Sequence, residues 1–249
     1  MRDELEKQAR FFQLGESYFW FASQNSIVER ELAPRLEAAG RRQAGRPLRI
    51  VDLGCGPGNT LRRLASKGAV YGFDFSLDAL RFAREKGVKH VLSADSIALP
   101  LVSESVDCIL ALDVLEHVED DRAALAEIAR VVRPGGLFLF TVPAFMGLWR
   151  YHDRCYRHYR RYTREELVGK VRAAGLDIEV CQFFKCAFFI PLWVLAKLER
   201  AGVISERDNF FTMPDWVNRM LETEITWEMR SGLARHVPFG VSLICIGRR

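Results

Sequence analysis

Residues 51–59 read VDLGCGPGN, and this stretch joins a short apolar run to the start of a helical pattern. Gly54, Gly56 and Gly58 stand at the turn, where a backbone without side chains can approach a ligand at a helix N-terminus. Their spacing, which follows Asp52, differs from the Gly-x-Gly-x-x-Gly spacing that holds the pyrophosphate of a dinucleotide. The loop therefore predicts a cofactor that carries no phosphate.

Two acidic residues follow the next two apolar runs. Asp74 ends the run at residues 70–74, where a carboxylate can accept hydrogen bonds from both hydroxyls of a ribose. Asp95 follows the run at residues 88–94, where it can accept a hydrogen bond from an adenine amino group. Either acid alone could be an ordinary helix cap, but the ordered set indicates a nucleoside site.

Apolar runs alternate with amphipathic helical patterns from residue 49 to residue 184, which predicts βαβ units and a parallel sheet. The predicted strands are residues 49–53, 70–74, 88–94, 107–112, 137–142, 177–183 and 241–246, and the predicted helices include 58–67, 77–85 and 121–132. Arg133-Pro134-Gly135-Gly136 is predicted as a turn before the fifth strand. Thr163 and Glu166 form a capping-box pattern that begins a further helix, which Gly175 ends.

Two segments fall outside this α/β pattern. Residues 1–46 are predicted as a helical N-terminal cap rich in aromatic residues, and residues 185–236 as a helical lid inserted between the sixth and seventh strands. Residues 47–184 and 237–249 then form the core. Insertions on a rigid scaffold usually carry specificity, so we expect both segments to close over a substrate.

Composition excludes several classes of protein. The 249 residues are 49% hydrophobic and 27% charged with a net charge of +4, which suits one globular core and argues against a dedicated nucleic-acid binder. No Cys-x-x-Cys pair and no apolar leader are present, so we expect reduced thiols and a cytoplasmic location. The apolar run Phe183–Leu198 contains Lys185 and Pro191 and is shorter than the ~20 residues of a membrane span. It predicts a lid over the substrate, or an interfacial helix at the inner face of a membrane.

The motif series resembles that of the class I S-adenosylmethionine-dependent methyltransferases: VDLGCGPGN, the acid of GFD, the acid of SADSIALP, LDVLEHV and RPGG. The resemblance covers about residues 49–145. It implies a Rossmann-like sheet of seven mostly parallel strands with a reversed last strand. It also implies S-adenosylmethionine as cofactor, S-adenosylhomocysteine as product, and adenine beside Phe75 and Ser96. The expected cofactor-contacting residues are Asp52, Gly54, Cys55, Gly56, Gly58, Asp74, Phe75, Asp95, Ser96, Leu112 and Asp113.

The flanks resemble a narrower branch of that family, with an N-terminal Y-x-W-F-x-x-R element and an H-D-x-x-x-x-H-x-R-R-Y-T element after the fifth strand. Gln24 stands where the branch has its Arg, so a contact of that Arg with the cofactor's carboxylate would be weakened or supplied by another residue. From the two elements we expect acceptor contacts by Trp20, Arg160, Arg161 and Tyr162.

Asp113, Glu116 and His117 lie at the end of the fourth predicted strand, the edge where such sheets bind ligands, and would share a face if the segment is helical. In the first alternative, Asp113 and Glu116 form hydrogen bonds to the backbone or to the cofactor, and His117 is a packed histidine or caps a helix. His117 could be a general base, since a neutral imidazole suits that task. The third alternative is a metal site, because acid-x-x-Glu-His resembles the divalent-ion motif of ubiquinone-pathway O-methyltransferases and small-RNA 2′-O-methyltransferases. We expect no metal.

His152, Asp153 and His158 follow the fifth predicted strand, with six arginines around them. His152 and His158 are further candidate bases, and Asp153 could fix the tautomer of His152. The stretch could also be a solvated basic loop. If it is functional, its Arg forks favour an anionic or phosphate-bearing acceptor, with one of Arg160 and Arg161 pairing with an acid instead.

The sequence thus predicts a methyltransferase that acts on a small molecule, by O-methylation of an anionic, glycosidic or lipid-linked acceptor. An RNA methyltransferase is the second hypothesis, although it would need a more extended basic face. A protein that binds S-adenosylmethionine without catalysis is the third, and the departure at Gln24 keeps it open.

Overall fold

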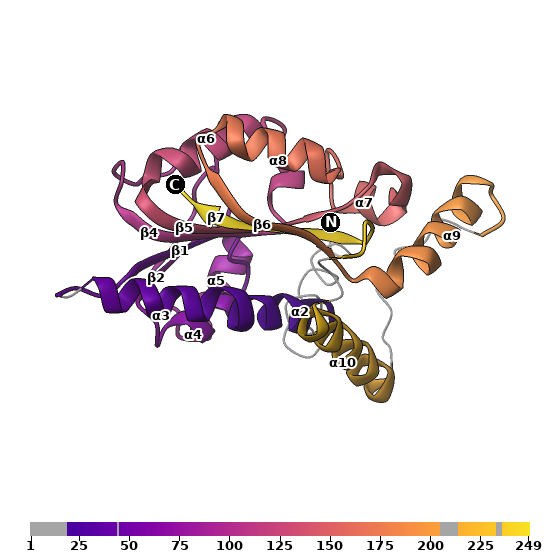
Figure 1. The fold of residues 1–249 in the computed structure, drawn as a ribbon, viewed down its shortest axis with the longest axis horizontal. Coiled ribbons are helices and arrows are strands. Elements are labelled where there is room, and N and C mark those ends of the chain that lie inside the picture. The colour runs from indigo at the N-terminus through magenta and orange to yellow at the C-terminus, as the bar shows by residue number, and fades with distance from the viewer. Residues whose placement is uncertain (1–18, 44, 205–213, 233–235) are drawn as a thin grey trace.

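Residues 19–43, 45–204, 214–232 and 236–249 are described by the computed structural model. Within them the strands are β1 (Arg49–Leu53), β2 (Ala69–Phe73), β3 (Val91–Leu92), β4 (Val106–Leu112), β5 (Val132–Pro143), β6 (Asp177–Phe184) and β7 (Ser242–Arg248). They form one sheet in the order β3-β2-β1-β4-β5-β7-β6, with β7 antiparallel to both of its neighbours (Figure 1). The predicted seven-stranded sheet with a reversed last strand is confirmed.

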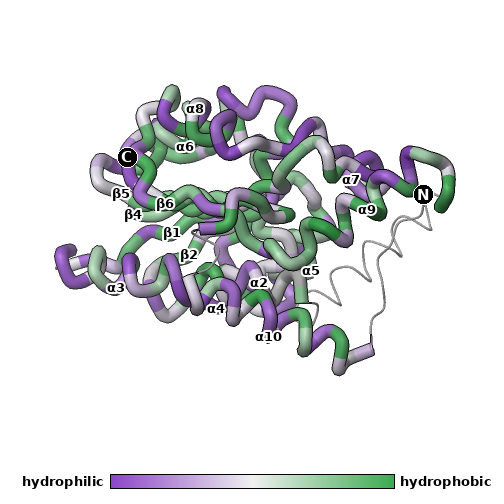
Figure 2. Tube along the Cα trace, turned by 45° about the vertical axis from the view of Figure 1, so that its right-hand side comes forward, coloured by the Kyte–Doolittle hydropathy of each residue, from purple (hydrophilic) through white to green (hydrophobic). Residues whose placement is uncertain are grey.

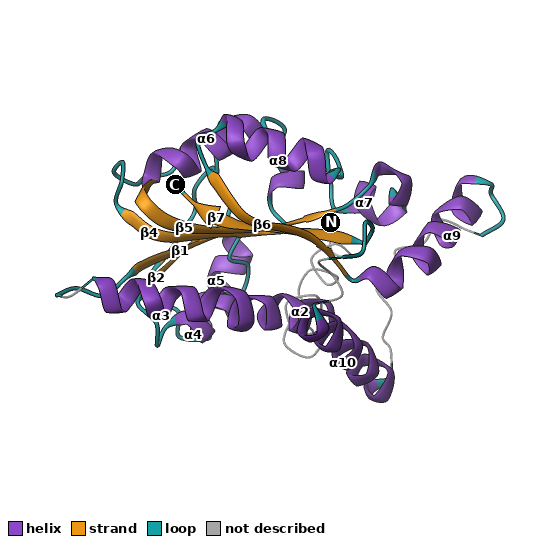
Figure 3. Cartoon of the chain, viewed as in Figure 1, coloured by secondary structure: helices purple, strands orange, loops and turns teal. Residues whose placement is uncertain are grey.

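Helices cover both faces of the sheet (Figure 3). The α-helices of the described chain are α2 (Phe19–Ile27), α3 (Ala33–Arg42), α4 (Asn59–Leu64), α5 (Leu77–Glu85), α6 (Asp121–Val131), α7 (Tyr151–Cys155), α8 (Arg164–Ala173), α9 (Phe189–Arg200) and α10 (Asp215–Ser231). Short turns lie at η1 (Val28–Leu32), η2 (Leu115–His117), η3 (Met146–Leu148) and η4 (Cys186–Phe188). Figure 1 shows α6 and α8 on one face and α3, α4 and α5 on the other.

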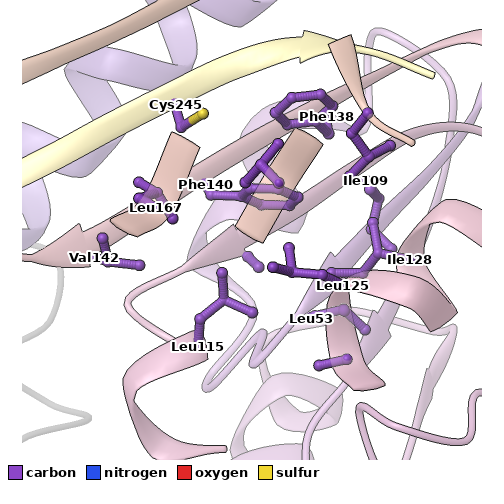
Figure 4. Packing of buried hydrophobic residues seen from close by; sticks show 14 of the residues in the cluster. Leu53, Ile109, Leu115, Leu125, Ile128, Phe138, Phe140, Val142, Leu167 and Cys245 are labelled. Carbon is purple, nitrogen blue, oxygen red and sulfur yellow. The ribbon is translucent and has the colours of Figure 1, made fainter. Parts of the chain in front are cut away.

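Each face of the sheet buries its own apolar core. On one face, Ile128 of α6 and Leu167 of α8 pack with Phe138 and Phe140 of β5 (Figure 4). On the other face, side chains of η1 and α3, such as Leu36, join the inward side chains of β1 and β4. The strands form the apolar centre of the chain trace in Figure 2. Burial on both faces explains why the central strands read as continuous apolar runs.

Local sequence signals fix where α8 begins. The hydroxyl of Thr163 accepts from the backbone N–H of Glu166 at 3.2 Å, and the carboxylate of Glu166 accepts from the N–H of Thr163 at 2.9 Å. These two bonds satisfy donors that a helix N-terminus would otherwise leave unpaired. The predicted capping box is confirmed.

The predicted turn at residues 133–136 is wrong, because these residues belong to β5. The register between β4 and β5 shifts between Val106 and Cys108, and the backbone N–H of Gly135 donates to the carbonyl of Arg249 at 2.7 Å. The segment is therefore an irregular strand that bonds to the end of the chain. β3 is also shorter than predicted, and α4 ends at Leu64.

The two flanking segments meet. The backbone N–H of Phe19 in α2 donates to the side-chain oxygen of Asn218 in α10 at 2.7 Å, and the rings of Phe19 and Phe188 stack with centroids 5.8 Å apart. Both segments are thus helical where described and in contact. Across the described helices, none combines the length and apolar character that crossing a bilayer requires.

Candidate active site

The glycine loop turns sharply between β1 and α4. Gly54, Gly56 and Gly58 have φ angles of 64°, 50° and 78°, a left-handed region that other residues rarely adopt. A Cβ atom at Gly54 would lie 2.5 Å from Val114, and one at Gly58 would lie 2.8 Å from Val88. A Cβ at Gly56 would meet no described atom within 4 Å. The outer glycines are thus required by packing, whereas Gly56 faces open space in which a ligand can approach the backbone.

Asp74 is tied to this loop through both of its carboxylate oxygens. Oδ2 accepts from the backbone N–H of Gly56 at 2.9 Å, and Oδ1 accepts from that of Ser76 at 2.8 Å. Burial raises the pKa of Asp74, while the two N–H donors lower it. Since each carboxylate oxygen can accept more than one hydrogen bond, Asp74 keeps capacity for the hydroxyls of a ribose.

The residues around Asp74 suit a flat ring. Phe75 is 83% exposed, an unusual state for a phenylalanine beside a polar site. Asp95 is exposed, and its Oδ1 accepts from the backbone N–H of Ile97 at 3.1 Å, with half-buried Ser96 between them. An open glycine, a carboxylate with spare capacity and an exposed aromatic ring together fit S-adenosylmethionine.

Two expected cofactor residues lie beneath the loop. Asp52 is 2% exposed in β1, and burial raises its pKa to about 8, with the charge of Asp74 adding to the effect. Cys55 is buried, and burial likewise raises the pKa of its thiol. Asp52 is therefore mostly protonated at neutral pH, and it lies buried in β1 directly before the glycine loop.

The end of β4 carries Asp113 in a left-handed conformation, with φ of 54°. One carboxylate oxygen accepts from the hydroxyl of Thr141 at 2.9 Å, and the other accepts from the side-chain amide of Gln24 at 2.6 Å. Leu112 is half-buried beside it. Gln24 thus joins the N-terminal helix α2 to the ligand edge. The motif series did not reveal this contact.

Sequence reasoning also missed Lys185, which is fully buried at the end of β6. Burial lowers its pKa to about 7, although the charges of Asp113 and Glu228 raise it. The side chain thus introduces a titratable cation between β4 and α10. A lysine inside the apolar run FFKCAFF was the signal for it.

A histidine cluster lies beside the end of β4. Nδ1 of His158 lies 2.9 Å from Oδ1 of Asp153, which is completely buried. Hydrogen bonds from His158 and Arg161 keep the pKa of Asp153 well below its usual range despite its burial. The carboxylate is therefore ionised, so Nδ1 of His158 donates and Nε2 is left to accept a proton. The histidine that pairs with Asp153 is thus His158, whereas the ring of His152 lies tilted against that of Tyr156 with centroids 4.4 Å apart.

His117 and Glu116 complete the cluster. The His117 ring lies 4.5 Å from the His158 ring, and burial lowers the pKa of His117 to about 4, with His158 adding to the effect. Burial raises the pKa of Glu116 well above its usual value, and the charge of Asp113 adds to the effect. At neutral pH the imidazole of His117 is therefore neutral, while burial favours the protonated form of the Glu116 carboxyl.

The same cluster could hold a divalent ion. Glu116, His117 and His158 each offer one ligand atom, and these atoms lie within 4.8 Å of one another. Oε2 of Glu116 is buried and has no hydrogen-bond partner among the described residues. This set differs from the alternative of Asp113, Glu116 and His117, because η2 is only a short turn and both oxygens of Asp113 have other partners.

Three of the four residues expected to contact an acceptor form hydrogen bonds or ion pairs with acidic side chains of the protein. Arg161 donates twice to Asp153, at 2.8 and 3.1 Å, and Arg160 pairs with Asp121 at 3.0 Å. Tyr162 is 1% exposed and its hydroxyl donates to Asp121 at 2.7 Å, so its ring is closed to a ligand. The side chain of Trp20 lies outside the described residues.

An apolar cleft of ≈ 530 Å³ opens next to Arg161. Its lining includes Phe145 and Met146 after β5 and Phe189 and Trp193 of α9. The Phe145 and Phe189 rings meet edge to face with centroids 5.5 Å apart. The cleft therefore has room for the apolar part of a small molecule within reach of the Arg161–Asp153 pair.

The chain is similar to known methyltransferases. A family model described as a methyltransferase domain matches residues 51–140. The malonyl-[acyl-carrier protein] O-methyltransferase of Pseudescherichia vulneris is 32% identical over 194 residues, which make up 75% of this chain and 77% of the relative. The chain belongs to the class I S-adenosylmethionine-dependent methyltransferases. The methyltransferase therefore uses S-adenosylmethionine as its cofactor.

Further relatives agree with this family. The ubiquinone biosynthesis O-methyltransferase of Hahella chejuensis is 27% identical over 196 residues, covering 70% of the methyltransferase and 82% of the relative. A crystal structure of an S-adenosylmethionine-dependent methyltransferase from Mesorhizobium loti superposes with a TM-score of 0.56 at 22% identity, covering 87% of this chain and 96% of that one. This last likeness shows a shared fold.

Proposed function

We propose that this methyltransferase transfers the methyl group to an oxygen atom of a small-molecule acceptor, with His158 as the general base. The Asp153–His158 hydrogen bond of 2.9 Å carries the proposal, because a buried carboxylate orients an imidazole whose ring lies 4.5 Å from that of His117, just after β4. When bound, S-adenosylmethionine supplies the methyl group and leaves as S-adenosylhomocysteine. The O-methyltransferases among the relatives support an oxygen acceptor.

The protein's own groups have three tasks in this reaction. The glycine loop and Asp74 hold the cofactor, through the exposed backbone at Gly56 and the carboxylate of Asp74. Nε2 of His158 accepts the proton that a hydroxyl acceptor loses as its oxygen forms the new bond to carbon. Asp153 stabilises the imidazolium that results. His117 is the weaker candidate for the base, because its pKa of about 4 lies far from neutral pH.

The cleft between α9 and the segment after β5 suits the acceptor's apolar part. Its aromatic lining, of which Phe145 and Trp193 are members, favours a ring or an acyl chain. Exposed Arg154 and Arg157 lie on and after α7, so an anionic or lipid-linked acceptor is part of the proposal. Arg160 and Arg161 keep supporting roles through their bonds to acids.

Transfer of labelled methyl from S-adenosylmethionine to panels of phenols, sugars, carboxylic acids and RNA tests the proposal. With a hydroxyl acceptor, His158→Gln should lower kcat by about 10²–10⁴-fold, while the affinity for S-adenosylhomocysteine stays unchanged. His90→Gln, at an exposed position, is the matched control. Transfer to RNA alone, or full activity of His158→Gln, would contradict the proposal.

Two additions to this assay separate the alternatives within the cluster. An equal loss in His152→Gln with no loss in His158→Gln would move the base to His152. Activity abolished by a chelator and restored by Mg²⁺ would mean that Glu116, His117 and His158 bind an ion, and the base would then be replaced by metal activation of the acceptor.

A further inference from the structure

The outer side of α9 is apolar and exposed. Ile190, Trp193 and Val194 are 63%, 43% and 42% exposed, and their spacing of three and four residues places them on one face of the helix. The ammonium group of Lys197 lies 5.4 Å from the Trp193 ring centroid. Tryptophan and lysine side chains that are apolar along their length and polar at the tip are typical of a membrane interface.

The opposite side of α9 is anchored to the protein. Ala196 and Glu199 are buried, and the carboxylate of Glu199 pairs with Arg150 at 2.7 Å. Both members of this pair are nearly enclosed, with side chains 5% and 10% exposed. This contact fixes the rotation of α9, so its apolar face is held outward and is not available to the core.

The exposed charges of α7 and α9 themselves have one sign. The acids of α7 and α9 are Asp153 and Glu199, and both are buried in ion pairs. Arg154, Lys197 and Arg200 are exposed on the same two helices. Across the described residues of α7 and α9, the exposed charges are therefore all positive.

The position of α9 brings these features to the outside of the molecule. Figures 1 and 2 show α7 and α9 at the same end, beyond the edge of the sheet. We propose that the apolar face of α9, defined by Ile190, Trp193 and Val194, and the cations of α7 and α9 bind the surface of an anionic lipid bilayer. Apolar side chains enter the headgroup layer while the cations meet lipid phosphates.

A bilayer fits this surface better than a second copy of the chain does. A two-fold contact would place the same patch against itself, and the exposed cations of the two copies would then repel one another. An anionic surface attracts every one of them.

The surface also leads to the proposed acceptor cleft. Trp193 belongs both to the apolar face of α9 and to the lining of the cleft, which also includes Phe145 and Arg161. A lipid-linked acceptor held in the bilayer could pass along this lining toward Arg161. This step rests on the proposed function, whereas the binding of the bilayer does not.

Cosedimentation with vesicles of phosphatidylcholine, alone or mixed with phosphatidylglycerol, tests the proposal on the full chain. The protein should bind the mixed vesicles, and the double variant I190S/W193S should bind at least about tenfold more weakly. The double variant R154E/K197E should lose the preference for anionic lipid. Val102→Ser is the control, because Val102 is 77% exposed before β4 and its change should leave binding intact.

Three results would overturn the proposal: no binding to either vesicle, equal binding by I190S/W193S, or dimerisation through α9 in sedimentation without vesicle binding. Calorimetric titration with S-adenosylhomocysteine shows that each variant is folded. Because vesicle binding is measured without turnover, failure of the proposed O-methylation leaves this result interpretable, and the reverse also holds.

Discussion

At the scale of single residues, Asp153 connects the candidate base to the fold. Its carboxylate accepts hydrogen bonds from His158, from the backbone N–H of Arg150 and from Arg161. The residue is fully buried, so its charge is stabilised only by these donors. One side chain therefore both orients the imidazole of His158 and binds Arg150 and Arg161 at the two ends of this stretch.

Asp153→Asn should lower the free energy of unfolding by about 3–5 kcal/mol at pH 7, because it leaves the guanidinium of Arg161 without its charge partner. The pKa of Asp153 is lower in the folded protein, so its contribution is present above the unfolded value of about 4 and is lost as the pH falls further. Chemical denaturation at pH 7 and at low pH measures both effects. The difference in the free energy of unfolding between Asp153→Asn and the unchanged protein should shrink in acid. The control Asp78→Asn should show no such change with pH. A difference for Asp153→Asn that does not change with pH would contradict this account.

At the scale of elements, the sequence predicted what depends on local pattern. The predictions of buried strands such as β4 and of the capping box at Thr163 were correct, because hydrophobic periodicity and helix capping depend on neighbouring residues in the sequence. The irregular start of β5 was missed, since its bonds run to Arg249, more than a hundred residues away along the chain. Glycine spacing and strand-end acids predicted the cofactor edge for the same local reason.

The acceptor side of the site could not be predicted in this way. Which histidine pairs with Asp153 depends on how the chain turns after β5, and no periodic pattern encodes that turn. Arg160 and Tyr162 were assigned to the acceptor by residue type, yet both bond to Asp121, which belongs to α6. Tertiary partners of polar side chains are set by the whole fold.

The ion pair between Arg150, which directly precedes α7, and Glu199 of α9 allows a further test at this scale. Glu199→Gln should lower the free energy of unfolding by about 3–5 kcal/mol, because the nearly enclosed Arg150 then lacks a counter-charge. Hydrogen exchange should speed up in α9 more than in β4, since the pair anchors that helix. Glu85→Gln, at an exposed position of α5, should change neither. If hydrogen exchange instead sped up equally in α9 and in the strands of the sheet, the ion pair would not be the contact that anchors α9.

At the scale of the whole molecule, two buried acids limit stability from opposite sides of the pH range. Asp153 loses its contribution in acid, as described above. Asp52 has a pKa of about 8 when folded, above its unfolded value of about 3.9, so its contribution is complete below the unfolded value and is lost as the pH rises toward 8. The decline is at most about 1.4 kcal/mol per pH unit for one proton.

Asp52→Asn should remove this decline, because the amide carries no charge to bury. The gain in Tm over the unchanged protein should grow between pH 5 and pH 8, whereas Asp177→Asn, at an exposed strand end, should give a constant difference. Thermal unfolding followed by circular dichroism at several pH values measures it. A difference that stays constant for Asp52→Asn would mean that Asp52 is ionised in the folded state.

The central claim is that the loop after β1 and the acid after β2 form the S-adenosylmethionine site, and calorimetric titration with S-adenosylhomocysteine tests it most directly. One molecule should bind per chain, and Asp74→Ala should weaken binding by about 1–3 kcal/mol, since the ribose hydroxyls lose their charged partner. Asp177→Ala should bind as the unchanged protein does, and NAD should not bind. Equal affinity in Asp74→Ala, or tight binding of NAD, would contradict the account.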